Sequence, residues 1–197
     1  MAERFGPAEI RAALATRESK RWPDGTVDRR AAVTLLLAPD PTDTERVEGL
    51  FVLRAQVDGD PWSGHVALPG GREDPGDADL LDAARRELVE ETAIELERDA
   101  YLGALHELAP RSVHLPSISV RPYVAWHDEQ PLVRENRELA GHLWIPLGEL
   151  AAPDRRSTIE RGGPTPRTFE TIEYAGATVW GMTLAIVDDF LERIGLR

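Results

Sequence analysis

The feature that most constrains this chain is a turn-rich segment that runs directly into an amphipathic helix. Residues 58–79 are dense in glycine, proline and aspartate and are predicted to form mostly loop. Residues 79–93 then carry the clearest helical pattern of the sequence, with Asp79 as the predicted N-cap. The predicted apolar face of this helix consists of Leu81, Ala84, Leu88 and Thr92. The fold must therefore pack this helix by one face immediately behind a long loop.

Three carboxylates lie near the end of this predicted helix. Glu87 and Glu91 are four residues apart and Glu90 is three from Glu87, so all three are expected on one side, away from the apolar face. Like charges at this spacing repel, whereas a divalent cation would reverse the sign, because magnesium takes hard oxygen ligands. The alternative is an ordinary solvated face in which Arg86 and Glu90 form an i,i+4 ion pair.

The loop before the helix favours the metal site over the solvated face. It ends in Pro69-Gly70-Gly71, and glycine backbone can approach other groups closely because it carries no side chain. A carbonyl oxygen brought next to the helix carboxylates could join the metal shell.

Strand-like runs surround the helix on both sides in the sequence. Strands are predicted at 31–38, 49–56, 101–106, 117–127, 143–146 and 171–179, with a short strand at 64–68 and a turn-rich connection at 39–48. Further helices are expected at 8–17 and 180–195, the second ending at Gly195. Mixed strands around two or three helices predict an α/β (α+β) sandwich in one domain, 1–197, whose topology propensity alone does not fix.

The amino-acid composition limits the classes of partner that this chain is expected to bind. Asp and Glu outnumber Lys and Arg by 35 to 23, and the net charge of −12 disfavours a nucleic-acid partner, because binding there depends on basic contacts. There is no cysteine for a disulfide or a thiolate zinc site, and no apolar run reaches the ~18 residues of a membrane span. The N-terminus lacks the apolar centre of a secretion signal. We therefore expect a cytoplasmic protein with a small-molecule partner, and a homodimer stays open.

Residues 71–94 resemble the Nudix box, G-x5-E-x7-R-E-U-x-E-E-x-G-U, in which U is a bulky aliphatic residue. Gly71 matches the first glycine and Ile94 the closing aliphatic position. The core R-E-U-x-E-E is matched residue for residue by Arg86-Glu87-Leu88-Val89-Glu90-Glu91.

Two departures from the box concern the loop and the helix end. The spacing from Gly71 to Arg86 is one residue longer than in the box, and the middle glutamate is replaced by Asp77 or lost. Ala93 stands where the box has its late glycine. Both departures affect the geometry of the loops and leave the helix carboxylates in place.

The resemblance implies a Nudix-type α/β/α sandwich with a mixed sheet and a loop-helix-loop box. It also implies a hydrolase of the diphosphate linkage of nucleoside diphosphate derivatives that uses Mg²⁺, with Mn²⁺ as a substitute. The implied metal ligands are Gly70, Glu87, Glu90 and Glu91, and Glu90 is the alternative general base. Arg86 would orient the carboxylates by ion pairing. Glu138 lies where Nudix enzymes often have a second acidic loop, which implies a catalytic or metal-binding role.

A finer resemblance is to the coenzyme A diphosphatase branch. Its pattern L-L-T-x-R-S-x-x-L-R-x-H-x-G-x-V-A-F-P-G-G is retained here at Leu50, Arg54, Gly64, Val66, Ala67 and Pro69-Gly70-Gly71. The branch often has the lengthened loop, an alanine at the position of Ala93 and a C-terminal helix that begins like Val179-Trp180-Gly181-Met182-Thr183. Leu68 replaces its phenylalanine, and no LR-x-H precedes the glycine.

This branch would hydrolyse coenzyme A or its thioesters to 3′,5′-ADP and phosphopantetheine. Arg54 would then bind a substrate phosphate, with a surface ion pair as the alternative, and Trp62 is the predicted base-stacking residue. Two other functions stay open at this point. One is hydrolysis of another substrate, such as ADP-ribose, NADH, a dinucleoside polyphosphate or a nucleoside triphosphate. The other is a binding module without catalysis.

Overall fold

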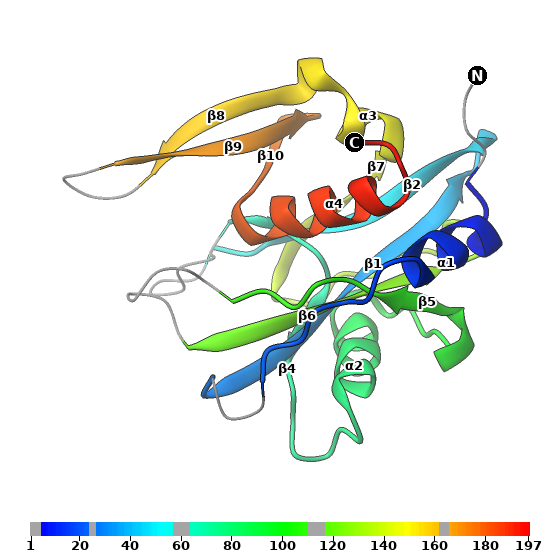
Figure 1. Cartoon of the computed structure of the whole chain (residues 1–197), viewed down its shortest axis with the longest axis vertical. Helices are drawn as coiled ribbons and strands as arrows, with labels where there is room; N and C mark the ends of the chain where they lie inside the picture. Colours follow the sequence, from blue (N-terminus) through cyan, green and yellow to red (C-terminus); the bar gives the residue numbers. More distant parts are fainter. Residues whose placement is uncertain (1–4, 24–26, 57–63, 110–116, 162–165) are drawn as a thin grey trace.

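The computed structural model describes residues 5–23, 27–56, 64–109, 117–161 and 166–197 (Figure 1). A mixed seven-stranded sheet lies at its centre. Its strands are β1 (Arg29–Asp40), β2 (Asp43–Arg54), β3 (Val66–Ala67), β4 (Gly70–Arg72), β5 (Tyr101–Ala104), β6 (Ile118–Trp126) and β7 (Leu139–Pro146). Strands β1 and β6 are parallel, and the other pairs are antiparallel. The predicted α/β (α+β) class is confirmed.

The centre of the sheet is split by the segment that carries the two glycines. Strands β1 and β2 pair directly only near their common turn, from Leu37↔Gly49 to Asp40↔Asp43. Further along, β3 pairs with β2 and β4 pairs with β1, so the short segment 66–72 lies between the two long strands. The loop predicted from the sequence is therefore anchored in the middle of the sheet.

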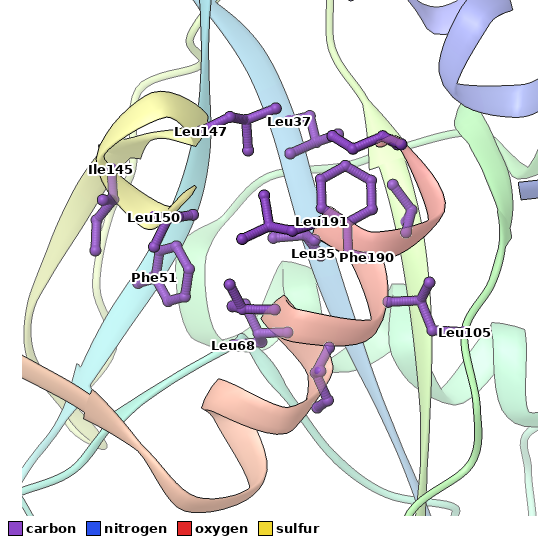
Figure 2. Packing of buried hydrophobic residues seen from close by; sticks show 14 of the residues in the cluster. Leu35, Leu37, Phe51, Leu68, Leu105, Ile145, Leu147, Leu150, Phe190 and Leu191 are labelled. Atoms are coloured by element: carbon purple, nitrogen blue, oxygen red, sulfur yellow. The ribbon is translucent and has the colours of Figure 1, made fainter. Parts of the chain in front are cut away.

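Helices cover both faces of this sheet, as predicted for an α/β/α sandwich (Figure 1). Helix α2 (Leu80–Thr92) lies on one face, whereas α1 (Pro7–Ala15) and α4 (Gly181–Arg193) lie on the other. Side chains alternate along β1, so Leu35 and Leu37 pack in the core that includes Phe190 and Leu191 of α4 (Figure 2). The intervening Leu36 packs in the core beneath α2.

Helix α2 begins and ends close to where the sequence predicts. The side chain of Asp79 accepts a hydrogen bond from the backbone N–H of Asp82 at 2.9 Å, which confirms it as the N-cap. The helix ends at Ala93, which adopts the left-handed conformation with φ of +59°. Helices α1 and α4 lie within the ranges expected at the two ends of the chain, apart from Pro7 at the start of α1.

One predicted connection and one predicted strand are wrong. Residues 39–48 are mostly strand, because β1 and β2 form a tight hairpin in which the Asp40 carboxylate accepts hydrogen bonds from the backbone and the hydroxyl of Thr42, both at 2.7 Å. The single strand expected at 171–179 is a hairpin of β9 (Arg167–Tyr174) and β10 (Ala177–Trp180). Its two turn residues, Ala175 and Gly176, have φ of +49° and +82°, the conformation that a two-residue hairpin turn requires.

Several elements carry no strong sequence signal. Strand β8 (Arg156–Arg161) pairs with β9 to complete a second, three-stranded sheet that extends away from the main sheet (Figure 1). Most of its side chains are exposed, so it lacks an alternating apolar pattern. The other short elements are α3 (Leu147–Ala151) and two 3₁₀ turns, Arg98–Ala100 and Pro153–Arg155. None of the helices in the described ranges has the length and hydropathy to cross a bilayer.

Candidate active site

The site is built where β4 meets α2, and its two glycines are required by different neighbours. Gly70 has φ of +152°, and a Cβ there would lie 2.3 Å from the carbonyl oxygen of Ala32 in β1. A Cβ on Gly71 would lie 2.4 Å from the carboxylate carbon of Glu87. Gly70 therefore allows the strand to insert beside β1, and Gly71 allows a helix carboxylate to contact the strand backbone.

The three helix carboxylates do not share one exposed side, which corrects the expectation from their spacing. Glu91 is 3% exposed, Glu87 is half-buried and Glu90 is exposed. Glu91 lies on the face of α2 that packs toward the sheet, because it is three residues after Leu88 and seven after Ala84, which are buried on that face. The backbone N–H of Gly70 donates to Glu91 Oε2 at 3.0 Å.

Arg86 connects the loop to the helix through charged hydrogen bonds. It donates to both carboxylate oxygens of Asp77, at 3.1 and 3.0 Å, and to the carbonyl of Arg72 at 2.8 Å. It also donates to Glu87 at 2.8 Å and to Glu90 at 3.3 Å, the i,i+4 pair expected from the sequence. The hydrogen bond from Arg86 is the main reason why the pKa of Asp77 is lowered. Asp77 therefore supplies the acid of the lengthened loop, and Arg86 holds it against the helix.

The pKa of Glu91 is raised to about 7, chiefly because burial disfavours its charged form. The hydrogen bond from Gly70 opposes this shift, and the negative charges of Glu87 and Glu138 add to it. The positive charge of Arg54 lowers the pKa of Glu91 again. The structure thus brings Arg54 and Glu138 within electrostatic reach of the buried helix carboxylate.

Glu87 is shifted in the same direction. Burial is the largest cause of its raised pKa, the hydrogen bond from Arg86 opposes the shift, and the charges of Glu90 and Glu138 add to it. Four carboxylates therefore lie close enough to repel one another electrostatically: Glu87, Glu90, Glu91 and Glu138. This concentration of negative charge was only partly visible in the sequence, where Glu138 is far from the helix.

Arg54 and Glu138 come together because the end of β2 lies beside the start of β7. Arg54 is the last residue of β2 and pairs with Leu139, the first residue of β7. The backbone N–H of Ala55 donates to the carbonyl of Glu138 at 2.8 Å. The preceding acidic residue, Glu135, instead contacts His142 at 2.6 Å. Of Glu135 and Glu138, Glu138 is thus the one that acts on the helix carboxylates.

The side chains beside Gly70 have the donor chemistry that a divalent cation requires. Among the described residues, no three or more histidine, aspartate or glutamate side chains are arranged to hold a metal ion by themselves. The donors are nevertheless hard carboxylate oxygens, and the negative charge of Glu138 acts on both Glu87 and Glu91. Magnesium usually takes only a few protein carboxylates and completes its shell with water and substrate phosphate, so the residues fit the ion. The metal-ligand roles of Gly70, Glu87, Glu90 and Glu91 stay predictions.

The start of the C-terminal helix also belongs to this region. The hydroxyl of Thr183 donates to the carbonyl of Val66 in β3 at 3.1 Å, across 117 residues of sequence. The ring of Trp180 contacts His65 with centroids 4.8 Å apart. Sequence reasoning missed these contacts, because no local pattern connects the two segments. The predicted base-stacking residue, Trp62, lies outside the described residues.

Comparisons with known proteins agree with this geometry. The NUDIX domain profile matches residues 28–162. Nudix hydrolase NudL of Yersinia enterocolitica is 30% identical over 167 residues, which cover 83% of this chain and 80% of the relative. Nudix hydrolase NudL of Yersinia pestis is 30% identical over 174 residues, or 86% of this chain and 81% of the relative.

A solved structure shows the same fold. The crystal structure of a MutT/nudix family protein from Enterococcus faecalis superposes with a TM-score of 0.60 and 17% sequence identity. The match covers 98% of this chain and 71% of that protein.

Proposed function

Because the chain belongs to the NUDIX domain family, we propose that it hydrolyses the diphosphate linkage of coenzyme A and its thioesters, releasing 3′,5′-ADP and the phosphopantetheine part. Family membership makes the chain a hydrolase that acts on pyrophosphate bonds. The identity of the substrate is our proposal, as is its preference over other nucleoside diphosphate derivatives.

One observation carries the choice of coenzyme A. The resemblance to the coenzyme A diphosphatase branch lies in 50–71 and 179–183, and the hydrogen bond from Thr183 to the carbonyl of Val66 joins these two segments at 3.1 Å. Strand β3 then leads within three residues to Gly70 and Gly71 of the site. Two stretches that are far apart in the sequence thus meet next to the segment that leads to the helix carboxylates, which supports a shared role in binding one substrate.

The residues that would hold a divalent cation are Glu87, Glu90, Glu91 and the carbonyl of Gly70. A magnesium or manganese ion bound there supplies positive charge for the diphosphate and makes a water molecule more acidic. Arg86 fixes the position of Glu87 and Glu90 through its hydrogen bonds to both. The Gly70 N–H fixes Glu91 in the same way.

The remaining residues act on the substrate and on the attacking water. Arg54, at the end of β2, would bind a substrate phosphate through its guanidinium group, which matches a phosphate geometrically. The water oxygen attacks one phosphorus, and the bond from that phosphorus to the bridging oxygen breaks. A carboxylate must accept the proton of this water, and Glu90 and Glu138 are the two candidates.

The test is a substrate panel in one magnesium buffer, with products identified by mass. Coenzyme A, acetyl-coenzyme A, ADP-ribose, NADH, a diadenosine polyphosphate and 8-oxo-dGTP are compared by kcat/KM, because only differential stabilisation of the transition state separates substrates with the same diphosphate chemistry. We expect coenzyme A to lead by at least about tenfold, which corresponds to roughly 1.4 kcal/mol. The Glu91→Gln variant serves as the control for a contaminating hydrolase.

Two outcomes contradict the proposal at different levels. A tenfold preference for ADP-ribose or NADH would remove coenzyme A as the substrate and leave the diphosphate chemistry unchanged. Turnover of no compound in the panel would contradict the assigned reaction itself.

A further inference from the structure

Three side chains from separate segments gather around the indole of Trp180, the last residue of β10. The ring centroids of Trp180 and His65 are 4.8 Å apart with planes at 66°, and those of Trp180 and Phe169 are 5.5 Å apart at 67°. The guanidinium carbon of Arg161 lies 5.6 Å from the centroid of the Trp180 ring. We infer that this cluster, Trp180, Phe169, His65 and Arg161, is a binding site for a purine base whose ribose carries a phosphate.

The cluster does not have the character of a packed core. Trp180, Phe169 and His65 are half-buried and Arg161 is exposed. The rings of His65 and Phe169 contact the indole edge-to-face. The group that lies over the indole ring is the guanidinium of Arg161. A partly exposed indole with a guanidinium group over it suits a flat heteroaromatic ring, because bases stack on tryptophan and arginine adds a cation–π contribution.

The charges beside the indole favour an anionic ligand. Arg161 in β8 is the cross-strand partner of Arg167 in β9, so two cations occupy directly opposite positions. Like charges at such positions destabilise a strand pair. Among the described residues, no carboxylate forms an ion pair with either arginine, in a chain whose net charge is −12. A phosphate bound between them would relieve this repulsion.

The cluster is also placed to serve the site described above. The backbone N–H of Arg54 donates to the carbonyl of His65 at 3.0 Å, and the charge of Arg54 acts on Glu91. A ligand whose diphosphate lies at the helix carboxylates would extend past Arg54 and His65 to place its base against Trp180. This inference rests on the proposed function for the identity of the base, which in coenzyme A is adenine with a 3′-phosphate on its ribose.

The experiment measures equilibrium binding to the full chain by calorimetry in the absence of divalent cations. The probes are the two halves of the proposed substrate, 3′,5′-ADP and phosphopantetheine. Trp180→Leu should raise the Kd for 3′,5′-ADP by about tenfold or more, the size expected for one lost base stack, whereas Trp180→Phe should retain most of the affinity. The Kd for phosphopantetheine should not change. Trp126→Leu, which removes a partly buried tryptophan elsewhere, should leave both Kd values unchanged.

Arg161 gives a second test that does not disturb the start of α4, because its side chain is exposed. Arg161→Gln should reduce the preference for 3′,5′-ADP over 5′-AMP, and Arg161→Lys should restore part of it. An unchanged preference in Arg161→Gln overturns the inference, even if Trp180→Leu fails to fold.

The outcomes separate this inference from the proposed function. If the parent enzyme hydrolyses coenzyme A but Trp180→Leu binds 3′,5′-ADP as the parent does, the inference is wrong and the proposed function stands. Equal weakening of 3′,5′-ADP and phosphopantetheine would show a structural role for Trp180 and also overturns the inference. If the parent does not hydrolyse coenzyme A, yet binding of 3′,5′-ADP depends on Trp180, the inference stands and the proposed function is wrong.

Discussion

The two ends of helix α2 carry similar numbers of acidic residues but hold them in opposite ways. At the N-terminal end, Asp79 contacts Arg98 at 2.6 Å, and Asp82 contacts both Arg98 and Arg85. At the C-terminal end, Arg86 forms an ion pair with Glu87 and must also neutralise Asp77 and Glu90. Glu91 is buried beside Glu87 and receives its hydrogen bond from the Gly70 backbone.

The pKa values report this difference directly. Arg98 lowers the pKa of Asp79, whereas burial raises the pKa of Glu87 and of Glu91. An acidic helix end whose carboxylates are paired with arginines needs no further cation. An acidic helix end that is buried with too few cations is poised to bind one. The number of acidic residues alone does not separate these two cases.

The largest expected effect comes from neutralising one carboxylate at the C-terminal end. Glu91→Gln should lower kcat/KM by more than about tenfold, because loss of a needed group around a metal costs at least that much. Glutamine keeps an oxygen that accepts from the Gly70 N–H, so the fold should persist. Steady-state kinetics with magnesium, together with a thermal melt, measure both expectations.

Asp82→Asn is the matched control for this variant, because it neutralises an acidic residue on the same helix that already has two arginine partners. Its kcat/KM should stay within about threefold of the parent. If both variants lost activity equally, the distinction between the two ends of the helix would be wrong.

The second prediction concerns the stability provided by Arg86. Asp77 is nearly buried and receives two hydrogen bonds from Arg86, so Asp77→Asn should lower the free energy of unfolding by about 1–3 kcal/mol, the range for hydrogen bonds to charged groups. Asp82→Asn breaks more exposed ion pairs and should cost less than about 1 kcal/mol. Urea denaturation of both variants gives the comparison, and a smaller loss for Asp77→Asn would contradict it.

The third prediction is a pH dependence of the metal-free protein. The pKa of Glu91 is about 7 in the folded state, above its ordinary value of 4.5, so the folded state binds this proton more tightly. The resulting contribution to stability is fully present below about pH 4.5 and is lost as the pH rises through about 7. In the presence of a chelator, the thermal midpoint of the parent should therefore fall relative to Glu91→Gln between pH 5 and 8.

Comparison with Glu91→Gln removes the contribution of other titrating groups, such as His106, whose pKa is lowered by burial and which both proteins contain. Millimolar magnesium should raise the midpoint of the parent at pH 8 by mass action, and should raise that of Glu91→Gln less. Parallel midpoint curves for the two proteins without metal would contradict the raised pKa of Glu91.

The smallest expected effect concerns the C-terminal boundary of the helix itself. Ala93 has φ of +59°, a conformation that costs an L-residue roughly 1 kcal/mol or more and glycine little. Ala93→Gly should therefore stabilise the protein by up to about 1 kcal/mol, after the greater entropy of glycine in the unfolded chain is subtracted. Urea denaturation measures this difference, and destabilisation would show that another contact of Ala93 outweighs the backbone strain.

The sequence predicted helix α2 almost to the residue, because an N-cap and a 3.6-residue apolar period are local properties. It also identified Arg86, Glu87, Glu90 and Glu91 as neighbours, since helix geometry fixes their spacing. It predicted the wrong connection at 39–48, where the tight turn depends on the Asp40 side chain and on pairing that continues beyond the apolar core of the strands.

Local sequence patterns predicted the helices α1, α2 and α4, most strands of the main sheet, and the glycines that allow a close backbone approach. Only the tertiary structure decided that Glu91 is buried against Gly70, that Arg54 and Glu138 act on it, and that Val66 meets Thr183. The reason is physical. Helical periods and caps depend on residues within one or two turns, whereas burial and the meeting of strand ends depend on which distant strands pair and in which register.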